Sequence, residues 1–172
     1  MKRAFSLRME RVLSFPNPVN EKAARVVAGV VLVTTIVVLA TGAYWLLVPL
    51  AYGFWARVLT GPTLSPLGAL AQKVIAPRLG PSKPVPGPPK RFAQGMGAAF
   101  STTALVLALA LGDHTPANVV LVLLAVAAGL ESIFAVCLGC QVFALLMRAG
   151  LVPQSVCAEC ADISLRLRSV AR

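Results

Sequence analysis

The chain contains four cysteines, and they form two Cys-x-x-Cys pairs: Cys137 with Cys140, and Cys157 with Cys160. Two thiols at this spacing can cycle between dithiol and disulfide, hand on sulfane sulfur, or supply thiolate ligands to a metal ion. The pairs are separated by a short stretch with turn residues, so all four sulfurs can meet at one surface. These cysteines are the candidate catalytic residues.

The two pairs are expected to differ in reactivity. Cys137 and Cys140 lie in a long apolar run that predicts a helix interior, where apolar surroundings raise the pKa of a thiol. Ser155 is a predicted N-cap, which places Cys157 in a first helical turn whose free amides favour the thiolate. We therefore expect Cys157 to attack, Cys160 to resolve, and the first pair to pass equivalents toward the apolar interior.

The spacing Cys-x2-Cys-x16-Cys-x2-Cys also matches a four-thiolate metal site. In this alternative, Cys137, Cys140, Cys157 and Cys160 bind zinc or an iron-sulfur cluster and hold the C-terminal tail in place without catalysis. A third interpretation is that the cysteines are inert or carry lipid modifications. His114 is expected in a loop on the far side from the sulfurs, as a solvated residue and not a ligand.

Composition and hydropathy indicate the class of protein. Of 172 residues, 58% are hydrophobic and 13% are charged, and the mean hydropathy is +0.80. The apolar residues occur in blocks and not at alternating positions, which favours helices over a transmembrane barrel. The sequence therefore predicts an all-α integral membrane protein, a four-helix bundle with short amphipathic helices at the cytosolic surface.

Four apolar runs predict the membrane spans. They cover about residues 24–40, 43–59, 92–111 and 117–147, and the fourth is longer than the roughly 20 residues that a span needs. The predicted domains are a basic N-terminal segment (1–19), a four-span domain (20–148) and an amphipathic tail (149–172). Within the four-span domain, a loop at 60–91 contains an extended proline-rich linker.

Cap and turn residues predict where several elements begin and end. The basic N-terminal segment is expected to form a weak surface helix that ends at Phe15-Pro16. Asn20 is a predicted N-cap for the first span, and Thr41-Gly42-Ala43 is the predicted reversal between the first two spans. Ser65-Pro66 predicts an N-cap followed by a proline in the first turn of a short surface helix.

The basic residues predict the orientation of these spans. Because cytosolic loops of membrane proteins are enriched in Lys and Arg, both termini and the central loop are expected in the cytosol, at a bacterial inner (plasma) membrane. The net charge of +10 fits attraction to anionic lipid headgroups. No aromatic-basic interleaving accompanies the charge, so nucleic-acid binding is not expected. The basic residues fall in three groups: Lys2, Arg3, Arg8, Arg11, Lys22 and Arg25; Arg57, Lys73, Arg78, Lys83, Lys90 and Arg91; Arg148, Arg166, Arg168 and Arg172.

Glu131 is an intramembrane polar residue, fourteen residues into the fourth apolar run. A carboxylate at that depth is costly, so it must be protonated, paired or in contact with water. One interpretation is a protonated Glu131 hydrogen-bonded to Gln94 or to the cluster at 101–103. Another is a small transporter or scaffold in which Glu131 and the polar face of the third span line a path.

Four short segments carry a family resemblance: Phe15-Pro16-Asn17-Pro18-Val19-Asn20, Gly61-Pro62-Thr63-Leu64-Ser65-Pro66-Leu67, Pro89-Lys90-Arg91-Phe92-Ala93-Gln94 and Cys137-Leu138-Gly139-Cys140. From about Phe15 to Arg148 the chain resembles the bacterial membrane-protein family catalogued as domain of unknown function 4395. Members of that family tend to occur with thioredoxin-like and sulfurtransferase proteins. The resemblance therefore implies a link to thiol or sulfur metabolism, and its Cys-x-x-Cys motif falls on Cys137, Gly139 and Cys140.

Together, these observations predict thiol-disulfide or sulfur-transfer chemistry at the cytosolic membrane face. The expected partners are the lipid bilayer and a soluble thioredoxin-like or sulfurtransferase protein.

Overall fold

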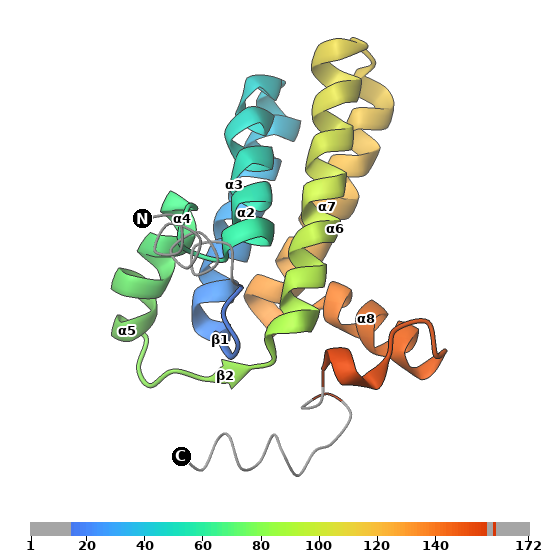
Figure 1. Cartoon of the computed structure of the whole chain (residues 1–172). Helices are drawn as coiled ribbons and strands as arrows, with labels where there is room; N and C mark the ends of the chain where they lie inside the picture. The colour runs from blue at the N-terminus through green and yellow to red at the C-terminus, as the bar shows by residue number, and fades with distance from the viewer. Residues whose placement is uncertain (1–14, 158–159, 161–172) are drawn as a thin grey trace, which may run out of the picture.

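The computed structural model describes residues 15–157 and residue 160. The predicted N-terminal helix before residue 15 and the amphipathic stripe of the tail after residue 160 lie outside these residues. Four long helices run roughly side by side along the molecule, while shorter helices gather at one end (Figure 1). We call this the lower end, as in the figure.

The first two long helices form a hairpin. Helix α2 (Glu21–Thr41) begins after Asn20, whose side chain accepts a hydrogen bond from the amide of Lys22 (3.0 Å). It ends at Gly42, which adopts a positive φ of 70°, so the predicted reversal at this glycine is confirmed. A 3-10 turn, η1 (Tyr44–Leu46), then leads into α3 (Leu47–Thr60).

The connection to the second hairpin lies at the lower end (Figure 1). Ser65 caps α4 (Pro66–Leu70) by accepting from the amide of Gly68 (3.1 Å), as the Ser-Pro pair predicts. Helix α4 continues into a π-helical turn, η2 (Ala71–Ile75), and into α5 (Ala76–Arg78).

The proline-rich segment that follows is not only a linker. Strand β2 (Pro84–Val85) pairs antiparallel with strand β1 (Val19–Asn20) at the lower end (Figure 1). Helix α6 (Gly87–Leu105) starts five residues earlier than the predicted third span. Its first turn includes prolines, which are tolerated there because the first amides of a helix have no intrahelical acceptor.

The second hairpin continues α6 through a π-helical turn, η3 (Val106–Ala110), and returns as α7 (His114–Phe134). The chain then turns aside into α8 (Leu138–Arg148), which leaves the lower end of α7 and points away from the long helices (Figure 1). A 3-10 turn, η4 (Gln154–Val156), leads to Cys157.

Small residues let these helices approach closely. Helix α2 packs along α7, α3 packs along α6, and α6 also contacts α7 and α8. The ring of Phe54 occupies the space that a side chain at Gly97 would need. Such close approach suits helices that associate in lipid, where van der Waals packing replaces the hydrophobic effect as the driving force.

The outer surface is apolar along the long helices. Val33 is 61% exposed and Leu123 is 53% exposed, which is favourable against lipid tails and unfavourable in water. Three helical stretches are long and apolar enough to cross a membrane: α2, α6 with η3, and α7. The predicted second span is shorter: η1 has 3 residues and α3 has 14, which give 17 in all. The fold is therefore an all-α membrane-type helical assembly.

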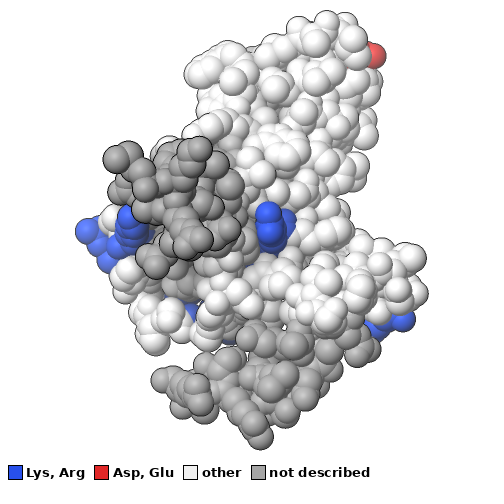
Figure 2. All heavy atoms as spheres, in the orientation of Figure 1, with Lys and Arg blue, Asp and Glu red and all other residues white. Residues whose placement is uncertain are grey.

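The charges divide the molecule along its length. In the view of Figure 2, Lys and Arg side chains occur in the lower half, while the upper half is almost entirely uncharged. The loop between η3 and α7, which contains Asp113, lies at the upper end (Figure 1). The structure thus brings the basic groups from separate parts of the sequence to one end.

Candidate cysteine site

The predicted fourth span is two helices and not one. Helix α7 ends at Phe134, and Ala135 takes a left-handed conformation (φ 59°) that stops the helix. The amides of Ala135 and Val136 both donate to the carbonyl of Leu130, which closes the last turn. Nothing in the apolar sequence 117–147 marks this break, because alanine is ordinarily the best helix former.

Arg25 of α2 stabilises the break from outside α7. Its guanidinium donates to the carbonyl of Ser132 (3.2 and 3.1 Å) and to that of Ile133 (3.0 Å). Carbonyls in the last turn of a helix have no intrahelical partner, and they carry the negative end of the helix dipole. Arg25 therefore provides hydrogen-bond donors for the carbonyls at the end of α7, over one hundred residues further along the chain.

The break places Cys137 at the N-cap of α8, with extended backbone angles (φ −91°, ψ 100°). Its Sγ accepts a hydrogen bond from the amide of Cys140 (3.2 Å). The expectation that this pair lies in mid-helix is therefore wrong. The free amides and the positive end of the α8 dipole favour a thiolate at Cys137, as in reactive cysteines at helix N-termini.

Cys137 and Cys140 form a disulfide, with their Cα atoms 5.2 Å apart. Cys137 is buried and Cys140 is half-buried. A reagent approaching from outside thus meets the sulfur of Cys140 more readily than that of Cys137. This order of exposure matters for the direction of thiol exchange.

Close contact with α6 fixes the position of α8. A Cβ on Gly139 would lie 2.6 Å from both Cα and Cβ of Ala93, so only glycine allows this approach. One turn further along, Phe143 packs against Phe92 with ring centroids 5.7 Å apart. The N-terminus of α8, and with it the disulfide, is therefore held against the first half of α6.

The second pair, Cys157 and Cys160, also forms a disulfide, with Cα atoms 5.2 Å apart. Ser155 lies inside the 3-10 turn η4, closed by a bond from the amide of Val156 to the carbonyl of Pro153 (3.1 Å). The predicted helix start at Ser155 is therefore wrong. Cys157 is buried, with 4% of its surface exposed, whereas Cys160 is exposed.

The four-thiolate metal site finds no counterpart in the described part of the chain. Over residues 15–157 and 160, no group of three or more His, Cys, Asp or Glu side chains is arranged to hold a metal ion. His114 begins α7 at the end opposite to α8, where it stacks on Tyr44 with ring centroids 4.5 Å apart (Figure 1). It is placed far from the sulfurs, as expected.

Glu131 has a different partner from the one predicted. Its Oε1 lies 2.6 Å from Nζ of Lys90 in α6, and both side chains are largely buried. Gln94 instead accepts a hydrogen bond from Arg57 (2.8 Å), and Ser101 donates to the carbonyl of Ala98. Glu131 therefore forms an ion pair with Lys90 in place of the predicted hydrogen bonds of a protonated carboxyl group. Lys90, which the sequence placed in the loop at 60–91, lies in α6 inside the assembly.

A cavity of about 400 Å³ lies between α2, α6, α7 and α8, with Phe54 of α3 also in its wall. Its lining includes Leu138 and Gly139, the two residues between the first cysteines, and also Glu131 and Gln141. Apart from such polar groups, its walls are apolar. The first disulfide therefore borders an apolar space that the sequence did not reveal.

Fold and site together define an all-α membrane-type protein that carries a Cys-x-x-Cys pair at a helix N-terminus. Residues 19–148 match the family described as Domain of unknown function (DUF4395), and the chain belongs to this family. The match includes Cys137 and Cys140 and ends before Cys157 and Cys160. No curated protein and no solved structure matches the chain.

Proposed function

We propose that this protein exchanges electrons with a thioredoxin-like dithiol partner through Cys137 and Cys140. The observation that carries the proposal is the N-cap position of Cys137, whose Sγ accepts the amide of Cys140 (3.2 Å). A sulfur held in this way is a good leaving group, because disulfide exchange is faster when the departing thiol has a low pKa. Structural cysteines in apolar packing lack such a feature.

The exchange follows from the exposure of the two sulfurs. A partner thiolate attacks Sγ of the half-buried Cys140, the disulfide bond breaks, and Cys137 leaves as a thiolate. The partner's second thiolate then attacks the partner's first sulfur in the mixed disulfide, and Cys140 leaves as a thiolate. Two electrons and two protons pass from the partner's dithiol to the pair, and the reverse reaction follows the same path.

The second pair extends this route toward the tail. Cys160 is exposed and Cys157 is buried. Exposure therefore favours Cys160 as the sulfur that meets a soluble partner and Cys157 as the one that resolves, the reverse of the roles suggested by the sequence. Thiol-disulfide exchange between the two pairs would then carry reducing equivalents from a soluble protein to Cys137 and Cys140.

The charges support an orientation for this chemistry. The lower end, which carries α8 and the basic groups, is proposed to face the cytosol of a bacterial inner membrane. There, soluble thiols are kept reduced and a permanent disulfide is disfavoured. Both pairs are then expected to cycle and not to serve as fixed crosslinks.

The test is a thiol count on purified full-length protein incubated with reduced thioredoxin and then alkylated. We expect two alkylated cysteines in the 137–140 peptide, with a reduction potential within the range of thioredoxin-like proteins, about −270 to −120 mV. A Cys157→Ser, Cys160→Ser double variant isolates the first pair. A first pair that thioredoxin cannot reduce, while dithiothreitol can, would overturn the proposal.

A further inference from the structure

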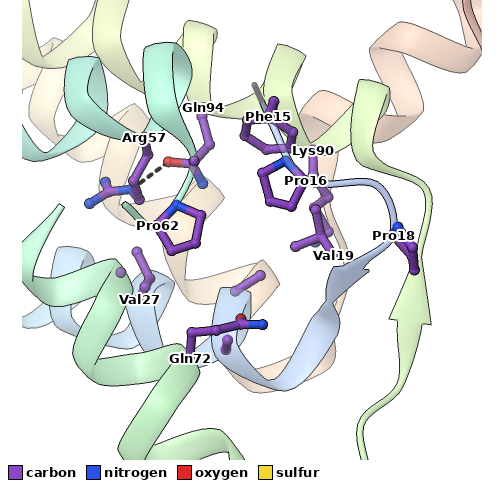
Figure 3. A pocket seen from close by; sticks show the side chains of 14 residues that line it. Phe15, Pro16, Pro18, Val19, Val27, Arg57, Pro62, Gln72, Lys90 and Gln94 are labelled. Carbon is purple, nitrogen blue, oxygen red and sulfur yellow. Dashed lines mark hydrogen bonds between the residues drawn. The ribbon is translucent and has the colours of Figure 1, made fainter. Parts of the chain in front are cut away.

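A second cavity lies at the lower end, on the other side of α6 from the disulfide. It measures about 100 Å³ and is lined by the segment before α2, the first turns of α2, the end of α3, the stretch 61–72 and the first turns of α6 (Figure 3). Pro16 closes one side, packed against Gly61 and Gly87. The cysteines do not line this cavity, so an inference from it is independent of the thiol chemistry.

The charged side chains that line this cavity are basic. Arg57 and Lys90 both contribute to the wall, and no aspartate or glutamate does. Lys90 is paired with Glu131, which lines the other cavity and not this one. Arg57 forms no salt bridge among the described residues, so the wall carries one positive charge without a counter-ion in direct contact.

The guanidinium of Arg57 is buried with one donor unused. Only 5% of the residue is exposed. Its Nε donates to Gln94 (2.8 Å) and its Nη1 to Ser65 (3.4 Å), while Nη2 is buried without a hydrogen-bond partner in residues 15–157 and 160. A buried donor left unsatisfied costs free energy, and the cost is greater for a charged group.

Two neutral donors lie in the wall beside these basic groups, while its remaining residues are glycines or carry apolar side chains. Because Oε1 of Gln94 accepts from Arg57, its amide nitrogen stays available as a donor. Figure 3 shows Gln94 and Gln72 on either side of Pro62, at the cavity. Gln72 is exposed and makes no side-chain hydrogen bond within the described chain, so its amide is free to approach a ligand.

We propose that this cavity binds a phosphate-type tetrahedral oxyanion. The volume exceeds the roughly 10–15 Å³ that one water needs by several-fold, which leaves room for an anion of about five heavy atoms. Water could satisfy Nη2 but would not neutralise Arg57, whereas an oxyanion does both. The anion is either a free ion or the phosphate of a lipid headgroup, because the basic lower end is also the end proposed to meet the cytosolic membrane surface.

The test uses full-length protein purified in dodecyl maltoside, a detergent without phosphate. Binding is measured by calorimetry with two probes: sodium phosphate against sodium chloride at equal ionic strength, and dihexanoyl phosphatidic acid against dihexanoylglycerol. We expect saturable binding of at least one phosphate probe and of neither control. Phosphate alone would assign a free ion, and phosphatidic acid alone would assign a headgroup.

Three variants locate the binding. Arg57→Gln removes the buried charge and Gln72→Glu places a negative charge at the cavity, so each should weaken binding by about tenfold or more. Arg91→Gln is the matched control: Arg91 is exposed and donates to the carbonyl of Val58 (3.0 Å), outside the lining. If Arg57→Gln does not fold, Gln72→Glu decides alone. No saturable binding of either probe, or equal binding in Gln72→Glu and the native protein, would overturn the proposal.

Discussion

Nζ of Lys90 lies 2.6 Å from Oε1 of Glu131, which pairs the beginning of α6 with the last turn of α7. The side chain of Lys90 is 9% exposed and that of Glu131 is 14% exposed. Neither charge can be removed without leaving the other uncompensated in a poorly solvated place. This ion pair therefore joins the two helices.

Breaking this pair from one side is expected to be costly. Glu131→Leu should lower the free energy of unfolding by about 3–5 kcal/mol, because Lys90 is left buried without a counter-ion. Glu131→Gln should also be destabilising, although less so, since the amide still accepts a hydrogen bond. The double variant Lys90→Met, Glu131→Leu should recover most of the loss. Equilibrium unfolding in mild detergent measures all three, and a double variant no better than Glu131→Leu would contradict the pairing.

Gly139 should not tolerate a side chain. Its Cβ would lie 2.6 Å from Ala93, so Gly139→Ala must push α8 away from α6, at an expected cost of about 1–3 kcal/mol. The Cys137–Cys140 disulfide should then be reduced more rapidly by glutathione. The control is Gly95→Ala, also in a helix but with nothing within 4 Å, which should stabilise by about 0.5–1 kcal/mol. Similar effects of both substitutions would argue against the close approach of α8.

We expect substitution of Arg25 to lower the free energy of unfolding more than its position near the start of α2 suggests. Arg25→Met removes all its hydrogen bonds to the end of α7 and should cost about 1–3 kcal/mol. Lys83→Met is the comparison, because Lys83 pairs with Glu21 (3.0 Å) while 67% exposed, and such surface pairs contribute about 0–1 kcal/mol. Hydrogen exchange at residues 130–137 should rise in the Arg25 variant only. Unchanged exchange there would rule out a role for Arg25 in ending α7.

The orientation is open to a direct check. A reporter inserted in the proline-rich segment at 81–89 and one fused after Arg172 should both signal from the cytosol. A reporter at Gly112 should signal from the opposite side, since that loop lies at the end away from the basic groups. An external signal from the first two would place the cysteines in an oxidising compartment and remove the basis for their cycling.

Much of the fold follows from local sequence. The cap at Asn20, the reversal at Gly42 and the start of α4 after Ser65 are all confirmed, because each depends on a residue whose side chain or backbone freedom acts within a few positions. The helix stop at Ala135 is different. It depends on a left-handed alanine and on Arg25, a contact made in three dimensions only.

The candidate site shows the same division. The residue types and the spacing of Cys137 and Cys140 were evident in the sequence, but the N-cap position of Cys137 was not, because it depends on the break in α7. The partner of Glu131 was also missed. Lys90 follows prolines that suggest a loop, and only the early start of α6 brings it into the interior.

The central claim is that Cys140 meets the partner and Cys137 resolves, and trapping of the mixed disulfide tests it most directly. In a background without Cys157 and Cys160, we use a thioredoxin whose resolving cysteine is replaced by serine and whose attacking cysteine carries thionitrobenzoate as the leaving group. Cys137→Ser should accumulate a mixed disulfide with this thioredoxin at Cys140, because neither protein keeps a resolving thiol. Cys140→Ser should trap little, since Cys137 is buried. Mass spectrometry of the linked peptides measures both, and an extra sulfur atom on Cys140 after incubation with a sulfurtransferase persulfide would indicate sulfur transfer instead. Trapping through Cys137 in preference to Cys140, or through neither, would contradict the account.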